Sequence, residues 1–191
     1  MRKVYVVADN IFSPLGKNTR DNMFALKQGR SAILEHHTHT ESFYAALFAP
    51  EDKTCDTSTT VFENIIISSA LDAIQNAGLN LPLDDKKTGF ILSTTKGNIS
   101  LIENLPDEFL PQDRVFLNTS SSVISDALGL ISEPLVVSHA CISGLLAMIT
   151  GMRLIQSGLY DHLVVSGGDL ITPFIYSGFR SFQAISPRPC T

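Results

Sequence analysis

One cysteine in this sequence occupies a place where a reactive thiol could be held. Residues 136–145 read VVSHACISGL, so a β-branched run ends at Ser138 and a helical pattern begins near Cys141. In α/β proteins, functional groups collect beyond the carboxyl ends of strands, where loops meet the N-termini of helices. Unpaired N–H groups and the helix dipole favour a thiolate there, by about 0.3–2 kcal/mol. Cys141 is therefore a candidate nucleophile.

A second interpretation of Cys141 needs no chemistry. Free cysteine is among the most buried residue types and commonly packs as a small apolar side chain. The dipole contribution is also modest, so strong activation would require a further group beside the thiol. Position and composition alone leave both interpretations of Cys141 open.

The histidines are the first candidates for that further group, or for a metal site. His139 is two residues before Cys141 and could reach the same loop, although its side chain could also point away. The HHTH stretch at residues 36–39 could suggest metal binding. No carboxylate or cysteine accompanies it at a fixed spacing, which favours a solvated loop. His162 opens a predicted strand and is interpreted as structural.

Composition restricts the class of protein. The chain has 191 residues, of which 44% are hydrophobic and 17% charged, as is typical of a compact globular domain. Its net charge is -5 and it has no basic stripe, so we expect no nucleic-acid partner. The cysteines at 55, 141 and 190 are far apart, which favours neither a zinc site nor a disulfide framework. We expect no cofactor.

No apolar run approaches the ~20 residues that span a bilayer. The N-terminal VYVVA run at residues 4–8 is too short for a signal peptide and predicts a buried strand. We therefore expect a cytoplasmic protein with no membrane span.

The hydrophobic pattern predicts strands alternating with helices. Such alternation favours right-handed βαβ crossovers and a largely parallel sheet in a single α/β domain. A polar, threonine-rich stretch is expected to be a surface excursion, and the segment after Thr172-Pro173 has a mixed pattern. The predicted strands are 4–8, 88–95, 135–138 and 162–166, the predicted helices 23–27, 61–77, 115–130 and 141–157, and the excursion 36–60.

The helix after Cys141 has a bare face. Gly144, Ala147 and Gly151 recur at three and four residues, so another backbone can approach closely. Its other faces are apolar, which places the helix inside the domain or at a subunit contact. We expect Cys141 to lie at the sheltered floor of a pocket.

Several motifs together resemble the β-ketoacyl-acyl carrier protein synthases of the thiolase superfamily. The resemblance covers essentially the whole chain, with residues 36–60 the least recognisable. Its motifs are SPLG at 13–16, GRSAI at 29–33, GFILSTTKG at 89–97, HACISG at 139–144, RLIQSGLYDHLVVSGGDLITPF at 153–174 and SGFRSFQAISPRP at 177–189.

The resemblance implies a thiolase-like α/β fold, namely one αβα half with a mostly parallel five-stranded sheet and helices on both faces. Residues 1–191 would form the N-terminal domain, and the C-terminal half would be absent. Cys141 would accept an acyl group as a thioester, and its N–H would be one oxyanion-hole donor, a group worth about 3–4 kcal/mol. Decarboxylation of a malonyl unit and Claisen condensation would follow, in fatty acid or polyketide-type biosynthesis.

The family also implies partners. These are acyl carrier protein bearing acyl and malonyl groups, and a second synthase subunit in a homodimer or heterodimer, with the region near 115–130 toward that contact. The catalytic histidines, a lysine and the second oxyanion donor are expected outside this chain. Ile142 departs from the small residue that the family mostly has there. It could pack in the core, which we favour, or reshape the acyl pocket.

A non-catalytic hypothesis competes with the enzyme. A half-domain could bind acyl chains or a partner synthase and modulate it. The retained Cys141 favours the enzyme, because non-catalytic relatives in the superfamily typically replace the nucleophile. Other thiolase-fold acyltransferases share the cysteine turn, but the SPLG and GGD-TP segments favour the ketoacyl synthases.

Overall fold

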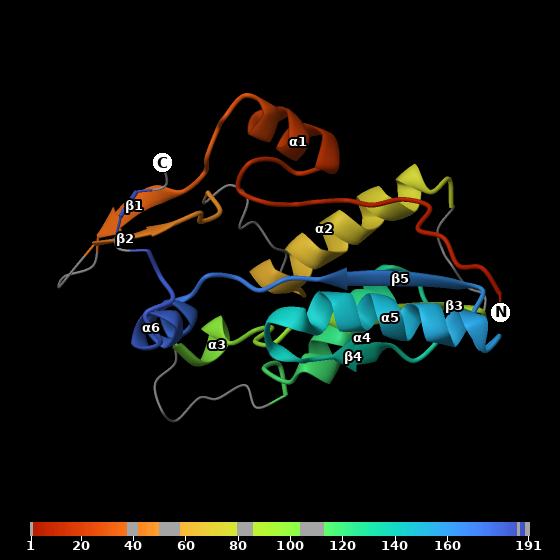
Figure 1. Cartoon of the computed structure of the whole chain (residues 1–191). Coiled ribbons are helices and arrows are strands. Elements are labelled where there is room, and N and C mark those ends of the chain that lie inside the picture. The colour runs from red at the N-terminus through yellow and green to blue at the C-terminus, as the bar shows by residue number, and fades with distance from the viewer. Residues whose placement is uncertain are drawn as a thin grey trace. The chain divides into compact units, whose positions relative to one another are not determined.

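The computed structural model describes residues 2–37, 42–49, 58–79, 86–103, 113–186 and 188–189. It contains two compact units (Figure 1). The first comprises Met1–Asn10 and Cys55–Asp169, and the second Ile11–Thr54 and Leu170–Thr191. Whether residues 1–191 act as a single domain stays a prediction.

A parallel sheet forms the centre of the first unit. Its strands are β3 (Thr88–Ser93), β4 (Leu135–Val137) and β5 (His162–Gly167), in the order β4-β3-β5. Both neighbours run parallel to β3, and every residue of β3 is buried. The predicted parallel sheet is confirmed, with three of the five expected strands in the described residues.

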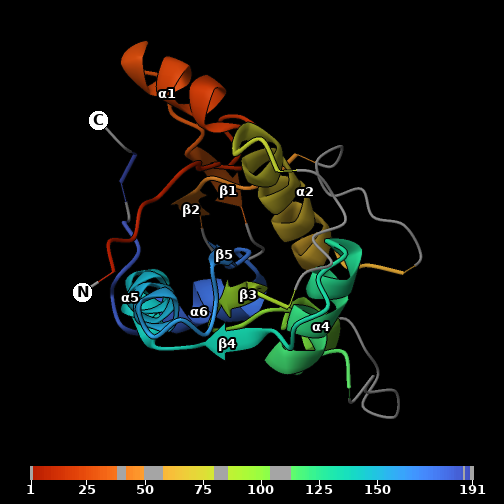
Figure 2. The ribbon, with the colours of Figure 1, turned by 90° about the vertical axis from the view of Figure 1, so that its right-hand side faces the viewer.

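Helices cover both faces of this sheet, as expected. Helices α2 (Val61–Asn76) and α4 (Leu117–Ala127) pack on one face, and α5 (Ser143–Gln156) packs on the other (Figure 2). The order β3-α4-β4-α5-β5 gives two crossover connections between parallel strands. The short helix α3 (Ser100–Glu103) precedes α4 in the chain.

Helix α2 begins and ends where the sequence predicts. The Thr60 side chain accepts a hydrogen bond from the Glu63 N–H at 3.2 Å, and the Glu63 carboxylate accepts one from the Thr60 N–H at 2.9 Å. This reciprocal pair is a capping box, which satisfies two of the free N–H groups at a helix start. Gly78 follows the helix with φ +71, a backbone angle that favours glycine.

A buried polar cluster joins the start of α2 to the loop after β3. The Glu63 side chain is fully buried, and its carboxylate forms an ion pair with Arg114 and accepts a hydrogen bond from Asn98 at 2.9 Å. The same Asn98 amide also donates to the Arg114 carbonyl at 2.9 Å and to the Ser120 hydroxyl at 3.0 Å. Asn98 thereby connects α2, α4 and the loop that leaves β3.

The second unit contains two helices and a β-hairpin. Helix α1 (Thr19–Lys27) is capped by the Asn18 side chain, and Gly29 follows it with φ +67, as the sequence predicts. Helix α6 (Pro173–Ser181) begins after Thr172, whose hydroxyl accepts the Ile175 N–H at 3.4 Å. Strands β1 (Leu34–His37) and β2 (Ser42–Ala45) pair antiparallel.

Part of the surface excursion predicted over residues 36–60 is a β-hairpin. Two short strands begin within or just before that stretch, and the ring of Phe43 contacts the rings of His36 and Tyr176, with centroids 5.4 Å and 4.1 Å apart. The sequence did not indicate these strands because each has only four residues, too few to show an alternation of apolar and polar side chains. Residues 38–41 and 50–57 of this stretch lie outside the described residues.

The predicted strand at residues 4–8 is also wrong. These residues form no strand in the structure, and Tyr5, Val6 and Val7 are 71–76% exposed. An apolar run becomes a strand only where a neighbouring edge supplies its hydrogen-bond partners. Here the segment is held near its start instead, by the ion pair of Arg2 with Asp161 at 2.9 Å.

We expect replacement of Glu63 by alanine to lower the free energy of unfolding by about 3 kcal/mol. The variant would leave Arg114 and Asn98 without their buried partner and would remove half of the capping box. Urea unfolding followed by circular dichroism measures the change. Glu133→Ala, at an exposed position, is the control and should change the value by less than about 0.5 kcal/mol. Equal losses for the two variants would contradict the role given to the cluster.

Candidate functional site

The turn between β4 and α5 holds the candidate nucleophile. After β4, a single turn of 3₁₀ helix covers Ala140–Ile142, and α5 begins at Ser143, two residues later than the predicted start at Cys141. Ala140 has φ +44, a left-handed angle that is strained for a residue with a side chain. Cys141 follows this strained residue directly, so it lies at a sharp corner of the chain.

The Ser143 hydroxyl fixes this corner. It accepts a hydrogen bond from the His139 N–H at 2.7 Å and donates one to the Ala140 carbonyl at 2.8 Å. The Ile142 N–H also donates to the His139 carbonyl, at 3.1 Å. These bonds close the turn on both sides of Cys141 and offset part of the cost of the strained backbone.

A face of small residues on α5 packs on the sheet. Ser143, Ala147 and Gly151 are the buried residues of this helix. Of the three residues predicted for the bare face, Ala147 and Gly151 are confirmed, whereas Gly144 is exposed. A Cβ atom added to Gly151 would lie 3.3 Å from Val165 on β5 and 3.5 Å from Ile91 on β3. Small residues therefore allow α5 to lie close against both strands, which fixes the position of the Cys141 turn above their ends.

The opposite face of α5 is open, and this corrects two expectations. Cys141 is exposed rather than sheltered at the floor of a pocket. Ile142 is 51% exposed, so it does not pack in the core. The sheet contacts only one side of the helix, and nothing in the described residues covers the other. That uncovered side also carries Leu145, Met148 and Met152, which are 41–61% exposed.

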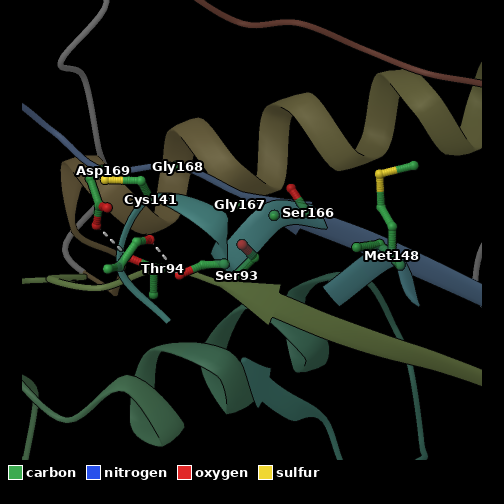
Figure 3. Close-up of a pocket in the computed structure, with 12 residues that line it drawn as sticks. Ser93, Thr94, Cys141, Met148, Ser166, Gly167, Gly168 and Asp169 are labelled. Atoms are coloured by element: carbon green, nitrogen blue, oxygen red, sulfur yellow. Dashed lines mark hydrogen bonds between the residues drawn. The ribbon is translucent and has the colours of Figure 1, made fainter. Parts of the chain in front are cut away.

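Cys141 lines an open cavity of about 390 Å³ (Figure 3). One side of it is the Cys141 turn with the first residues of α5, and the other is formed by the carboxyl ends of β3 and β5. This is where parallel sheets place their functional groups. The lining residues are Ser93, Thr94, Ala140, Cys141, Ser143, Gly144, Met148, Val165, Ser166, Gly167, Gly168 and Asp169.

Gly167 allows β3 and β5 to stay close at this end. A Cβ atom added to Gly167 would lie 2.1 Å from the Ser93 carbonyl oxygen and 2.7 Å from the Ser93 Cβ. The Gly168 N–H donates a hydrogen bond to the same carbonyl at 3.2 Å, whereas a Cβ atom added to Gly168 would meet only Ile66, at 3.7 Å. The backbone of the adjacent strand thus requires glycine at position 167.

Asp169 also lines the cavity, and we had not predicted it as a site residue. Its carboxylate accepts hydrogen bonds from the hydroxyl of Thr94 at 2.6 Å and that of Thr95 at 3.0 Å. It also accepts the N–H groups of Thr95 at 3.2 Å and Lys96 at 3.0 Å. A signal was present, since an acidic residue follows the Gly-Gly end of one strand and two threonines end another.

No histidine of the described residues lines this cavity. His139 is exposed and does not line it. His36 contacts the Ala45 carbonyl at 3.0 Å and His37 the Ser42 hydroxyl at 2.7 Å, so both belong to the hairpin. His162 begins β5, in agreement with its structural interpretation.

The described part of the chain contains no group of three or more His, Cys, Asp or Glu residues that could hold a metal ion. His39, Cys55 and Cys190 lie outside it. Among the helices of that part, none has the length and apolar character needed to cross a membrane.

Comparison with known proteins agrees with this geometry. A family model described as "Beta-ketoacyl synthase, N-terminal domain" matches residues 37–191. The chain is 23% identical over 209 residues to 3-oxoacyl-[acyl-carrier-protein] synthase 2 of Coxiella burnetii, covering 98% of this chain and 50% of the relative. The protein of the same name from Vibrio cholerae is 25% identical over 211 residues, with the same coverage. The chain thus spans about half the length of these curated relatives.

Solved structures show the same fold. A β-ketoacyl synthase from Burkholderia phymatum superposes with a TM-score of 0.81 at 17% identity, covering 98% of this chain and 52% of that one. The ketosynthase ApeO in complex with its chain length factor ApeC, from Xenorhabdus doucetiae, gives 0.76 at 20% identity, covering 100% and 54%. A type II polyketide ketosynthase in complex with its acyl carrier protein gives 0.79 at 17% identity, covering 99% and 51%.

Replacement of Gly167 by alanine should destabilise the first unit by about 1–3 kcal/mol, because the new methyl group would meet backbone that no side-chain rotation can move. Thermal unfolding monitored by circular dichroism measures this. Gly178→Ala is the matched control, since a Cβ atom there would meet nothing within 4 Å and alanine favours the helix α6. A Gly167→Ala protein as stable as the Gly178→Ala protein would contradict the packing described for β3 and β5.

Proposed function

The chain belongs to the β-ketoacyl synthase family, and we propose from this that it forms the N-terminal part of a β-ketoacyl-acyl carrier protein synthase. In this proposal Cys141 receives an acyl group from acyl carrier protein and presents it for decarboxylative Claisen condensation with a malonyl unit. The reaction would belong to fatty acid or polyketide-type biosynthesis. One observation carries the proposal: the cysteine lies on a strained strand–turn–helix corner, exposed to a cavity at the carboxyl ends of β3 and β5.

The first step is transfer of the acyl group. The Cys141 sulfur attacks the carbonyl carbon of the acyl thioester and forms a new carbon–sulfur bond. The bond to the carrier's sulfur breaks, and the proton lost by the Cys141 thiol balances the thiolate that leaves. The Cys141 N–H is the donor proposed for the developing oxyanion, as the family resemblance implies. Each such donor contributes about 3–4 kcal/mol in acyl transfer.

The second step is condensation. Loss of carbon dioxide from the malonyl unit leaves an enolate, whose carbon attacks the acyl carbonyl and releases the Cys141 thiolate. Decarboxylation requires base and donor groups arranged around the thiol. We propose that histidines, a lysine and a second oxyanion donor supplied by the remainder of the synthase perform this step, since His139 does not line the cavity.

The proposal includes partners and location. We expect acyl carrier protein bearing acyl and malonyl groups, and a homodimer or a heterodimer with a related synthase, in the cytoplasm. Two of the similar solved structures support this proposal, because they are themselves complexes. One is a ketosynthase bound to its chain length factor, and the other is a ketosynthase bound to its acyl carrier protein. The open apolar side of α5 is consistent with a covering partner surface.

Mass spectrometry of the intact protein tests the nucleophile. The complete synthase, or this chain together with the chain that complements it, is incubated with octanoyl-acyl carrier protein. We expect one octanoyl adduct per chain, and Cys141→Ala should lower the rate of its formation by at least about 10³-fold. Cys55→Ala and Cys190→Ala are matched controls that should keep the adduct.

Two results would contradict this function. An adduct that survives in Cys141→Ala would assign the chemistry to another residue. Failure of the unmodified protein to form any adduct would favour the non-catalytic alternative, a half-domain that binds acyl chains or modulates a partner synthase.

A further inference from the structure

The carboxylate of Asp169 connects the loops that follow β3 and β5, beyond the last paired residues Ser93 and Gly167. Asp169 follows Gly168 just beyond β5, whereas Thr94, Thr95 and Lys96, which donate to it, follow β3. One oxygen accepts the Thr94 hydroxyl and the Thr95 and Lys96 N–H groups, and the other accepts the Thr95 hydroxyl. Four hydrogen bonds to one carboxylate are charge-assisted and stronger than bonds between neutral groups.

The connection continues below Asp169 into the buried part of the unit. Thr94 is 1% exposed, and its hydroxyl accepts the Gly97 N–H at 3.0 Å while donating to Asp169 at 2.6 Å. Gly97 precedes Asn98, which the buried Glu63 holds. Hydrogen bonds, together with the peptide bond from Gly97 to Asn98, therefore link Asp169 to the start of α2.

These contacts form the wall of the cavity that faces Cys141. Thr94 and Asp169 line the cavity together with Gly167, Gly168 and Cys141 (Figure 3). The distance between this wall and the turn sets the room for a bound acyl thioester. Displacement of a reacting group by about 1 Å can cost a factor of roughly 100 in rate.

We propose that Asp169 is a positioning residue for the reaction at Cys141. By holding the loop after β5 against the loop after β3, it fixes the cavity wall against which the acyl thioester lies when the sulfur attacks. This inference rests on the proposed function, because it concerns the same cavity and the same nucleophile.

A role for Asp169 as the base that deprotonates Cys141 fits the contacts less well. The hydrogen bonds that this carboxylate accepts come from Thr94, Thr95 and Lys96, and none of them comes from Cys141. The same donors also spread its negative charge, which would otherwise oppose a thiolate in the shared cavity. Positioning therefore accounts for the four contacts, and proton transfer does not.

The test compares two electrophiles on Asp169→Asn in the complete synthase. Asparagine keeps the size of the side chain but turns an N–H₂ group toward groups that also donate. The rate of Cys141 acylation by octanoyl-acyl carrier protein should fall by about 10- to 100-fold. The rate of alkylation by iodoacetamide, a small reagent that does not have to be positioned against the cavity wall, should change by less than about twofold. The midpoint of the pH profile of alkylation should stay within about 0.3 pH units of the midpoint measured for the unmodified protein.

Asp161→Asn is the matched control. Asp161 directly precedes β5, at the opposite end of the strand from Asp169, and pairs with Arg2 at 2.9 Å. We expect Asp161→Asn to leave both rates unchanged. Equal acylation rates for Asp169→Asn and the unmodified protein would overturn the inference, and so would a shifted pH midpoint, which would indicate a proton-transfer or electrostatic role. A parallel loss of both reactions would indicate a general loss of structure and also count against positioning.

A double-mutant cycle sharpens the result. Thr94→Val removes the hydroxyl that Asp169 holds most closely, so Asp169→Asn should add little to the acylation defect of Thr94→Val. Multiplicative defects would show that the two residues act separately and would overturn the proposed connection. The outcome is distinct from failure of the proposed function, which would appear as absence of a Cys141 adduct in the unmodified protein.

Discussion

The loop that leaves β3 is held between two carboxylates, and the candidate site depends on this constraint. Glu63, fully buried at the start of α2, holds Asn98 from one side, and Asp169 accepts the hydroxyls and N–H groups of residues 94–96 from the other. β3 itself is buried along its whole length between two parallel neighbours. A strand end fixed in this way gives the cavity one rigid wall, and Gly167 brings β5 against it at a distance that no side chain would allow.

The other wall is positioned by packing instead of charge. Ala147 and Gly151 let α5 lie against β3 and β5, and the Ser143 hydroxyl then closes the turn at the helix start. The strain at Ala140 is tolerated because the surrounding bonds determine the turn from several directions. The two walls thus use different interactions, yet both originate at the carboxyl ends of adjacent strands, which explains how residues far apart in the sequence come to share one cavity.

The local sequence pattern was sufficient to predict the elements that are determined by residues close to them in the chain. The capping box at Thr60 marks the start of α2, the positive-φ glycine at 78 marks its end, and the small residues of α5 indicate close packing. Pattern failed where a long-range partner decides the outcome. Residues 4–8 have the composition of a strand but pair with no other strand in the structure. The strands Leu34–His37 and Ser42–Ala45 pair with each other, although their sequences do not show the pattern of a strand. Asp169 was missed for the same reason, since its partners are more than seventy residues away in the chain.

The exposure of Cys141 separates two requirements of the proposed reaction. Placement of the nucleophile is complete in the first unit, because the turn, the helix and the facing strand ends are all held by its own contacts. Stabilisation of a developing oxyanion is different, since preorganised donors act strongly only where water is excluded. The side of α5 that bears Leu145 and Met148, next to Ile142 of the preceding turn, is apolar and exposed. In the proposed synthase we expect the surface that excludes water from the sulfur to lie against it. The same contact would therefore bury this side of the helix and supply the water-free site that the proposed chemistry requires.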